Sequence, residues 1–262
     1  MEEICVKTPW ASHLGDVPMH LDYYKGTMFE AIELIAQKYP NNVAFDFMGK
    51  ATTYRKLVER VKRCARALKT IGVRENDKVT IALPNCPQAI YMFYAVNLVG
   101  AIANMIHPLS AEKEIEFYLN ESDSVTAITL DQFYEKFEAV RENTKVVNII
   151  IASIKDELSV PIKAGYMLTT GRKIKKIPDS APVIMWNAFL KLSKACFYKY
   201  RVPRKSEDAA VILYSGGTTG KTKGIVLTNQ NFNSLGQQVV AANPMFRVGD
   251  KMLAAMPLFH GF

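Results

Sequence analysis

The side chains most able to do chemistry lie in one glycine-rich run between Tyr214 and Gly224. This run holds four glycines, four Ser or Thr hydroxyls and two lysines within eleven residues. Glycines let backbone N–H groups approach a phosphate closely. Hydroxyls add hydrogen-bond donors and a ligand for Mg²⁺, and lysines supply positive charge. The composition therefore predicts a loop that binds the phosphates of a nucleotide, and with it a nucleotide-dependent enzyme.

The end of this run, from Gly220 to Thr222, also resembles a Walker A loop, G-x-x-x-x-G-K-[ST]. That pattern needs a glycine five residues before Gly220, where this chain has Ser215. A Walker loop also leads from a strand into a helix. Here apolar residues on both sides, at 210–214 and 225–228, predict a strand, a loop and a second strand. The sequence therefore favours a hairpin loop over a P-loop NTPase.

Two motifs resemble those of the AMP-forming acyl- and aryl-CoA synthetases, the adenylate-forming enzymes. The glycine-rich run matches their signature [YF]-[ST]-[SG]-G-[ST]-[TS]-G-x-P-K-G except at Thr222, which replaces a proline and leaves the loop less rigid. Downstream, Pro257-Leu258-Phe259-His260 is similar to the family's P-x-x-H motif beside the acyl pocket. The resemblance extends over about 28–262, because four further segments follow the family in order: Thr53–Leu57, Gly72–Val79, Leu83–Pro87 and Gly100–Asn104.

The resemblance implies that ATP, with Mg²⁺, activates a carboxylic acid to acyl-AMP, which coenzyme A then converts to a thioester. Lys223 would neutralise the departing pyrophosphate, a task shared with Lys221, and Thr218 would contact Mg²⁺. His260 would gate the acyl pocket or orient the carboxylate, although a lone histidine is more often structural. The nucleotide-binding residues that the resemblance implies are Ser215, Gly216, Gly217, Thr218, Thr219, Gly220, Lys221, Lys223 and Gly224.

The overall resemblance and the apolar residues around His260 indicate a medium- or long-chain fatty acid as the substrate. Aryl-CoA ligases and the adenylation domains of peptide synthetases are the alternatives within the same superfamily. Because family members are roughly twice as long, we expect an N-terminal fragment that lacks the C-terminal domain and is inactive by itself. Apolar sheet surface left uncovered would favour homo-oligomers. A non-catalytic nucleotide- or membrane-binding module is the alternative from another class.

Length and composition indicate a globular protein. The chain has 262 residues, 49% of them hydrophobic, and a mean hydropathy of −0.01. It contains neither a run of 18 apolar residues nor a signal-peptide pattern. The four cysteines are too far apart for a CxxC pair or a metal site: Cys5, Cys64, Cys86 and Cys196. We therefore expect a cytoplasmic protein with reduced thiols.

The net charge of +8 is concentrated between residues 161 and 205, where eleven Lys or Arg face one acid, Asp179. A basic balance suits ATP and coenzyme A. Within this stretch, residues 185–198 mix aromatic side chains with lysines, as interfacial helices do, so peripheral membrane contact is one hypothesis. No recognisable nucleic-acid module accompanies the charge, and no nucleic-acid partner is expected. The favoured interpretation is a buried aromatic face with solvated lysines.

Strand and helix patterns alternate along most of the chain. A capping box at Thr27 and Glu30 opens a helix to about Lys38. Further helices are predicted at 54–70, 87–99, 111–120 and 132–140, and strands at 43–47, 79–83, 101–106, 125–130 and 146–152. Such alternation predicts an α/β fold with largely parallel sheets and helices on both faces.

The whole of 1–262 is expected to form part of an N-terminal AMP-binding, or adenylation, region with three parts. Residues 28–152 would form a first α/β unit, where the alternation is regular. Residues 153–207 would form a basic, irregular insert with a helix from Val183 to Tyr200. Residues 208–262 would hold the phosphate-loop hairpin and begin a second α/β unit.

Overall fold

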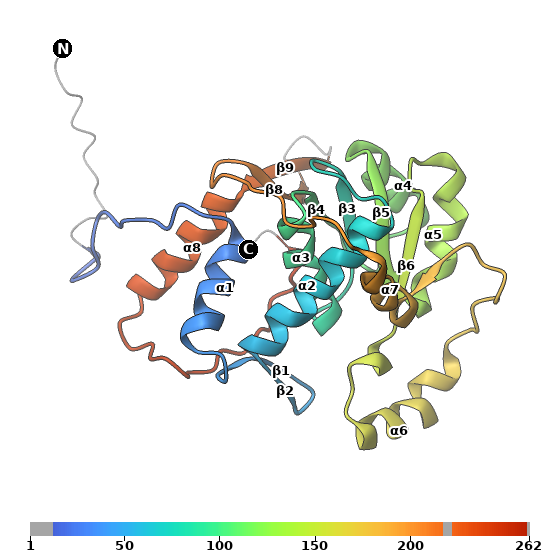
Figure 1. Ribbon diagram of the computed structural model, residues 1–262, viewed down its shortest axis with the longest axis horizontal. Coiled ribbons are helices and arrows are strands. Elements are labelled where there is room, and N and C mark those ends of the chain that lie inside the picture. Colours follow the sequence, from blue (N-terminus) through green and yellow to red (C-terminus); the bar gives the residue numbers. More distant parts are fainter. Residues whose placement is uncertain (1–12, 217–221, 261–262) are drawn as a thin grey trace, which may run out of the picture.

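The alternating strands and helices build one seven-stranded sheet, in the order β7-β6-β5-β3-β4-β8-β9 (Figure 1). A computed structural model describes residues 13–216 and 222–260. Neighbouring strands are parallel except for the antiparallel pair β8–β9. The strands are β3 Lys78–Ala82, β4 Ile102–Met105, β5 Ser124–Leu130, β6 Asn148–Ala152, β7 Ile184–Met185, β8 Ala209–Gly216 and β9 Thr222–Thr228. β1 Val43–Phe47 and β2 Lys50–Thr53 form a separate hairpin. The predicted α/β class is confirmed.

Helices cover both faces of this sheet, each over its own apolar core. One layer consists of α1 Met28–Lys38, α2 Tyr54–Thr70, α3 Pro87–Leu98 and α7 Trp186–Leu192. The opposite layer consists of α4 Glu112–Glu121 and α5 Tyr134–Val140. α8 Asn229–Ala241 packs beside α1, and α6 Val160–Leu168 lies at the lower edge of Figure 1, away from both layers. The helix predicted at 54–70 is α2, and its apolar stripe is buried, at Leu57, Val61, Ala65 and Leu68.

Local hydrogen bonds set where two of these helices begin. At α1 the Thr27 hydroxyl accepts from the Glu30 N–H at 3.1 Å, and the Glu30 carboxylate accepts from the Thr27 N–H at 2.9 Å. At α8 the Thr228 N–H donates to the Asn231 side-chain oxygen at 2.8 Å, and the Asn231 N–H donates to the Thr228 hydroxyl at 3.2 Å. Such reciprocal bonds satisfy donors that the first turn leaves unpaired.

The predicted helix within 183–200 is wrong in its extent. α7 ends at Leu192 and a 3₁₀ turn follows over Ser193–Ala195. Side chains of α2 contact this end of α7: Arg63 donates to the Leu190 carbonyl at 3.0 Å, and Thr70 donates to the Leu192 carbonyl at 3.2 Å. These bonds satisfy carbonyls that the last turn of a helix leaves without intrahelical partners.

The favoured interpretation of the aromatic and lysine-rich segment is confirmed for α7 but wrong beyond it, where Phe197 is 93% exposed and Tyr198 55%. Trp186, Phe189 and Leu190 are buried, whereas Lys191 and Lys194 are exposed. The predicted helix at 132–140 begins as a 3₁₀ turn over 131–133 and continues as α5. None of the helices in the described ranges is long and apolar enough to cross a membrane.

Candidate functional site

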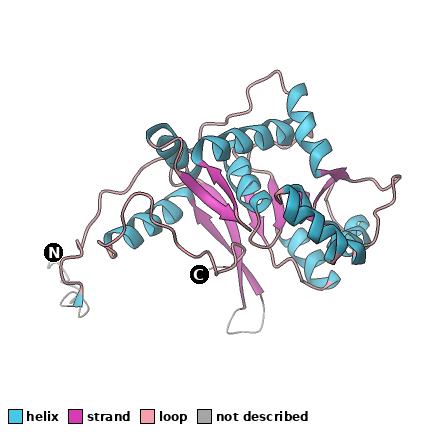
Figure 2. Ribbon diagram, turned by 90° about the horizontal axis from the view of Figure 1, so that it is seen from below, coloured by secondary structure: helices cyan, strands magenta, loops and turns pink. Residues whose placement is uncertain are grey.

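Strands β8 and β9, which carry the described ends of the glycine-rich run, extend beyond the ends of the other strands (Figure 2). In its register Ser215 faces Lys223 and Gly216 faces Thr222. Ser215, Gly216 and Lys223 are exposed. The remaining predicted residues of the loop lie outside the described residues: Gly217, Thr218, Thr219, Gly220 and Lys221.

The described base of the hairpin carries the donors that a polyphosphate needs. Ser215 and Lys223 stand opposite each other and are exposed, and a Cβ added at Gly216 would meet no atom of the described residues within 4 Å. A ligand could therefore approach this backbone closely. These residues fit the phosphates of ATP in charge, donor type and access.

The opposite face of the hairpin is fixed by Tyr214. Its ring lies 4.4 Å from the Tyr118 ring on α4, and its hydroxyl donates to the Tyr118 carbonyl at 3.4 Å. Burial raises the pKa of Tyr214 to about 12, so it stays a neutral donor. A Cβ at Gly224 would lie only 3.3 Å from this ring and 3.3 Å from Ile212. Gly224 therefore has a packing role beside the nucleotide role predicted for it.

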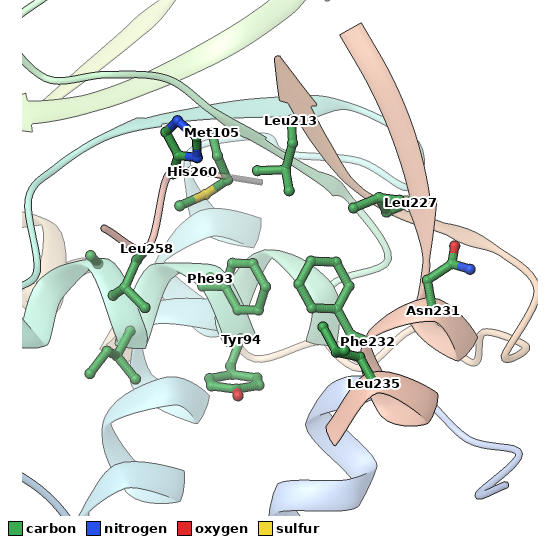
Figure 3. Close-up of a pocket in the computed structure, with 12 residues that line it drawn as sticks. Phe93, Tyr94, Met105, Leu213, Leu227, Asn231, Phe232, Leu235, Leu258 and His260 are labelled. Atoms are coloured by element: carbon green, nitrogen blue, oxygen red, sulfur yellow. The ribbon is translucent and has the colours of Figure 1, made fainter. Parts of the chain in front are cut away.

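An apolar cavity of about 480 Å³ lies beside the hairpin (Figure 3). Its walls come from α3, β4, β8, β9, α8 and the segment that carries His260: Ala89, Ile90, Phe93, Tyr94, Met105, Leu213, Leu227, Asn231, Phe232, Leu235, Leu258 and His260. Among these described residues none is Asp, Glu, Lys or Arg. The size and lining suit a small molecule with a hydrocarbon part.

Strand alternation connects this cavity with the phosphate-binding residues. Residues paired across antiparallel strands point to the same face, and every second residue along a strand shares that face. Ser215 and Lys223 therefore lie on the face of Leu213, which lines the cavity. Lys223 does not line this cavity: it borders a second one, of about 710 Å³, against α4 on the other side of the sheet.

The segment that carries His260 is held at the carboxyl end of β3 by Asn85. The Asn85 amide donates to the carbonyls of Ala254 at 2.9 Å and Met256 at 2.8 Å. Its oxygen accepts from the Leu258 N–H at 2.9 Å. One side chain thus makes three hydrogen bonds to the backbone leading to His260.

The same segment is held at the carboxyl end of β4 by His107. The His107 ring lies 4.6 Å from the Phe259 ring in an edge-on contact. Its Nδ1 accepts from the Leu109 N–H at 3.0 Å, which orients the ring. Chains leave β3 and β4 toward opposite faces of the sheet, and such a reversal of direction is where ligands bind in α/β sheets.

The structure brings His260 and the hairpin together around one cavity, although the sequence separates them by more than thirty residues. In Figure 3, His260, Met105 and Leu213 lie along one edge of the cavity, and Tyr94 and Phe232 lie along the opposite edge. The contacts of Asn85 and His107 with this segment were not predicted. The available signal was a polar residue two or three positions after a buried parallel strand, at the edge of the sheet where such sites form.

A family model described as AMP-binding enzyme matches residues 32–262. The long-chain-fatty-acid–CoA ligase of Bacillus subtilis (strain 168) is 31% identical over 257 residues, which are 96% of this chain and 46% of that protein. The ligase of the same name from Salmonella typhimurium is 30% identical, over an alignment that covers 98% of this chain and 47% of that protein. This chain therefore spans about half the length of the curated relatives it matches.

Solved structures support the fold. A long-chain-fatty-acid-CoA ligase from Archaeoglobus fulgidus superposes with a TM-score of 0.71 at 24% identity, over 92% of this chain and 44% of that one. A benzoate CoA ligase from Burkholderia xenovorans LB400 gives a TM-score of 0.61 at 19% identity, over 80% and 36% of the two chains. Because the family model matches residues 32–262 of this chain, the chain belongs to the AMP-binding enzymes.

Proposed function

We propose that this chain supplies the phosphate-binding loop and part of the acyl pocket of an ATP-dependent, AMP-forming ligase that activates a fatty acid. The activation would proceed through acyl-AMP to a coenzyme A thioester. The observation that carries the proposal is the uncharged cavity of about 480 Å³, whose wall includes His260 and Leu213, two residues before Ser215 on the same strand. Burial of a hydrocarbon chain against such a wall favours binding, since each buried CH₂ contributes about 0.8 kcal/mol to the binding free energy. The relatives named as long-chain-fatty-acid–CoA ligases support the same substrate class.

The described residues have separate tasks in this proposal. Ser215 and Gly216 bind phosphate oxygens through N–H and O–H donors, and Lys223 neutralises charge as pyrophosphate leaves. His260 orients the carboxylate at the edge of the cavity. ATP, when bound, supplies the AMP group of the activated acid. Mg²⁺ enters the proposal through Thr218, which lies outside the described residues.

ATP–pyrophosphate exchange on the full gene product tests the whole proposal. Medium- and long-chain fatty acids should support exchange, and acetate should not. Lys223→Ala should lower the exchange rate by about a hundredfold, the loss typical of one oxyanion-stabilising donor. Lys251→Ala, at another exposed lysine, should leave the rate unchanged. Exchange with benzoates or amino acids alone would move the assignment to an aryl-CoA ligase or a peptide-synthetase adenylation domain.

Binding to this chain by itself separates substrate binding from catalysis. A fluorescent fatty acid should bind in the cavity and be displaced by unlabelled long-chain acids, while exchange activity stays absent from the chain alone. Fatty-acid binding together with no exchange by the full gene product would favour a non-catalytic binding module. No binding of fatty acid to either protein would overturn the assignment of the cavity.

A further inference from the structure

α6 carries an apolar stripe that faces solvent. Val160, Ala164, Met167 and Leu168 are spaced i, i+4, i+7 and i+8, which places them on one side of a helix. Val160 is 83% exposed, Met167 42% and Leu168 62%. We call these four residues, with the cations Lys163, Arg172 and Lys173, the α6 surface.

Nothing in the described part of the chain covers this stripe. α6 contains no buried residue, and the elements it contacts most are the 3₁₀ turns next to it in sequence. Ile162 and Tyr166 are half-buried and occupy another side of the helix. A nine-residue helix with a glycine inside is too short to be stable in water without packing. The stripe therefore has the properties of a surface that packs against something outside the chain.

The charges around the stripe indicate what that partner is. Residues 160–176 contain five cations and no acid. Lys175 pairs with Glu135 at 2.8 Å and Lys176 with Asp179 at 3.3 Å. Lys163, Arg172 and Lys173 are exposed and form no ion pair with any described residue. Exposed apolar side chains next to unpaired cations complement a surface that is apolar below and anionic above.

We propose that the α6 surface docks this protein on an anionic lipid bilayer. The apolar stripe enters the boundary between headgroups and acyl chains, and Lys163, Arg172 and Lys173 contact lipid phosphates. This assignment does not rest on the proposed ligase activity. It also moves the membrane hypothesis within 161–205 away from α7, whose aromatic side chains are buried, to α6.

Flotation with lipid vesicles tests the proposal on this chain. The chain should float with vesicles that contain phosphatidylglycerol, bind weakly to vesicles of phosphatidylcholine alone, and lose binding as salt is raised. Met167→Glu/Leu168→Glu should abolish flotation. The triple variant of Lys163, Arg172 and Lys173 to Gln should weaken the partition coefficient by about fivefold for each cation removed.

Matched controls distinguish binding by the α6 surface from nonspecific binding through other exposed apolar residues or through the net charge. Met245→Glu changes another exposed apolar residue, 85% exposed, and should bind like the parent chain. A triple Lys-to-Gln variant at Lys25, Lys113 and Lys251, all exposed, removes equal charge elsewhere and should also bind like the parent. Circular dichroism should show that every variant keeps its fold, because the α6 side chains are not part of a core.

Several outcomes would overturn the proposal. Equal flotation of the parent and both α6 variants would show that another surface binds lipid. Equal binding to neutral and anionic vesicles would remove the role of the cations. Self-association of the parent without lipid, lost on Met167→Glu/Leu168→Glu, would assign the surface to a second copy. Binding to a DNA or RNA duplex that competes with vesicles and is lost in the triple α6 variant would assign it to nucleic acid.

Discussion

The cavity beside His260 and the α6 surface are both apolar but differ in enclosure and charge. The cavity is walled by three kinds of element, helix, strand and loop, and its described lining contains no Asp, Glu, Lys or Arg. The α6 surface is open to solvent and lies among cations. An apolar wall closed on several sides selects a ligand by shape, whereas an open apolar stripe with cations selects a surface by charge.

The difference shows that hydrophobic composition alone does not assign a function. Leu235 in the cavity and Leu168 on α6 are the same residue type with similar exposure, 51% and 62%. Leu235 belongs to a cavity because α3, β8 and β9 bring other apolar groups around it. Leu168 lacks such neighbours because α6 lies apart from both helical layers (Figure 1).

A charge placed in the cavity should have a larger effect on fatty-acid binding than loosening the segment that carries His260. Leu235→Glu should weaken fatty-acid binding by at least about tenfold, because a carboxylate would lie against the hydrocarbon chain. Displacement of a fluorescent fatty acid from this chain measures the change. Val240→Glu is the matched control, because Val240 lies on the same helix and is 58% exposed but does not line the cavity. Equal losses in the two variants would contradict the assignment of the cavity.

A smaller effect is expected from loosening the segment that carries His260. Asn85→Ala removes three hydrogen bonds to 254–258, so fatty-acid affinity should fall about fivefold and proteolysis within this segment should accelerate. Asn85→Asp keeps the acceptor for Leu258 but loses the donors to two carbonyls, and should not restore binding.

The control for Asn85 is Asn233→Ala. The Asn233 amide donates to the Gly26 carbonyl at 2.9 Å, so the control also releases a loop, but one away from His260. Unchanged digestion of 252–260 in Asn85→Ala would show that the hydrogen bonds of Asn85 do not hold this segment. Vesicle flotation should be the same for both variants, since neither touches the α6 surface.

The smallest effect is expected at Arg201, near the C-terminal end of the basic stretch 161–205, where ion pairs attach this stretch to α1. Arg201 binds Glu33 at 2.7 Å and Glu30 at 3.1 Å, and Lys62 also contacts Glu33, at 2.6 Å. Burial would by itself raise the pKa of the Glu33 carboxyl, but the hydrogen bonds from Lys62 and Arg201 outweigh it and lower the pKa below its usual value. The end at Arg201 is therefore held by ion pairs, whereas α6 is not.

This lowered pKa predicts a pH-dependent contribution to stability. The ionised Glu33 stabilises the fold at pH values above its unfolded pKa of about 4.3, and the contribution is lost as pH falls through the lower folded pKa. Glu33→Gln should lower the free energy of unfolding by about 1 kcal/mol at neutral pH. Melting temperatures measured from neutral pH to pH 3 should converge for the two proteins. A constant difference across that range would contradict the ionic anchor, and Glu59→Gln, at an exposed acid, should show no difference.

The order and type of most elements could be predicted from the sequence because their signals are local. The capping box at Thr27 and Glu30, the stripe of α2 and the strand–loop–strand pattern around Ser215 each depend on residues a few positions apart. The extent of α7 could not be predicted in this way. It ends where Arg63 and Thr70, more than 120 residues earlier, donate to its last carbonyls.

The sequence by itself therefore determined the α/β class, the hairpin that presents the glycine-rich run, and the importance of His260 as a candidate. Only the tertiary structure decided that Asn85 and His107 hold the segment of His260 across two strand ends. It also decided that one face of α7 is buried, whereas α6 has no buried residue. The physical reason is range: propensity and capping act between near neighbours, whereas burial depends on which distant surfaces a helix meets.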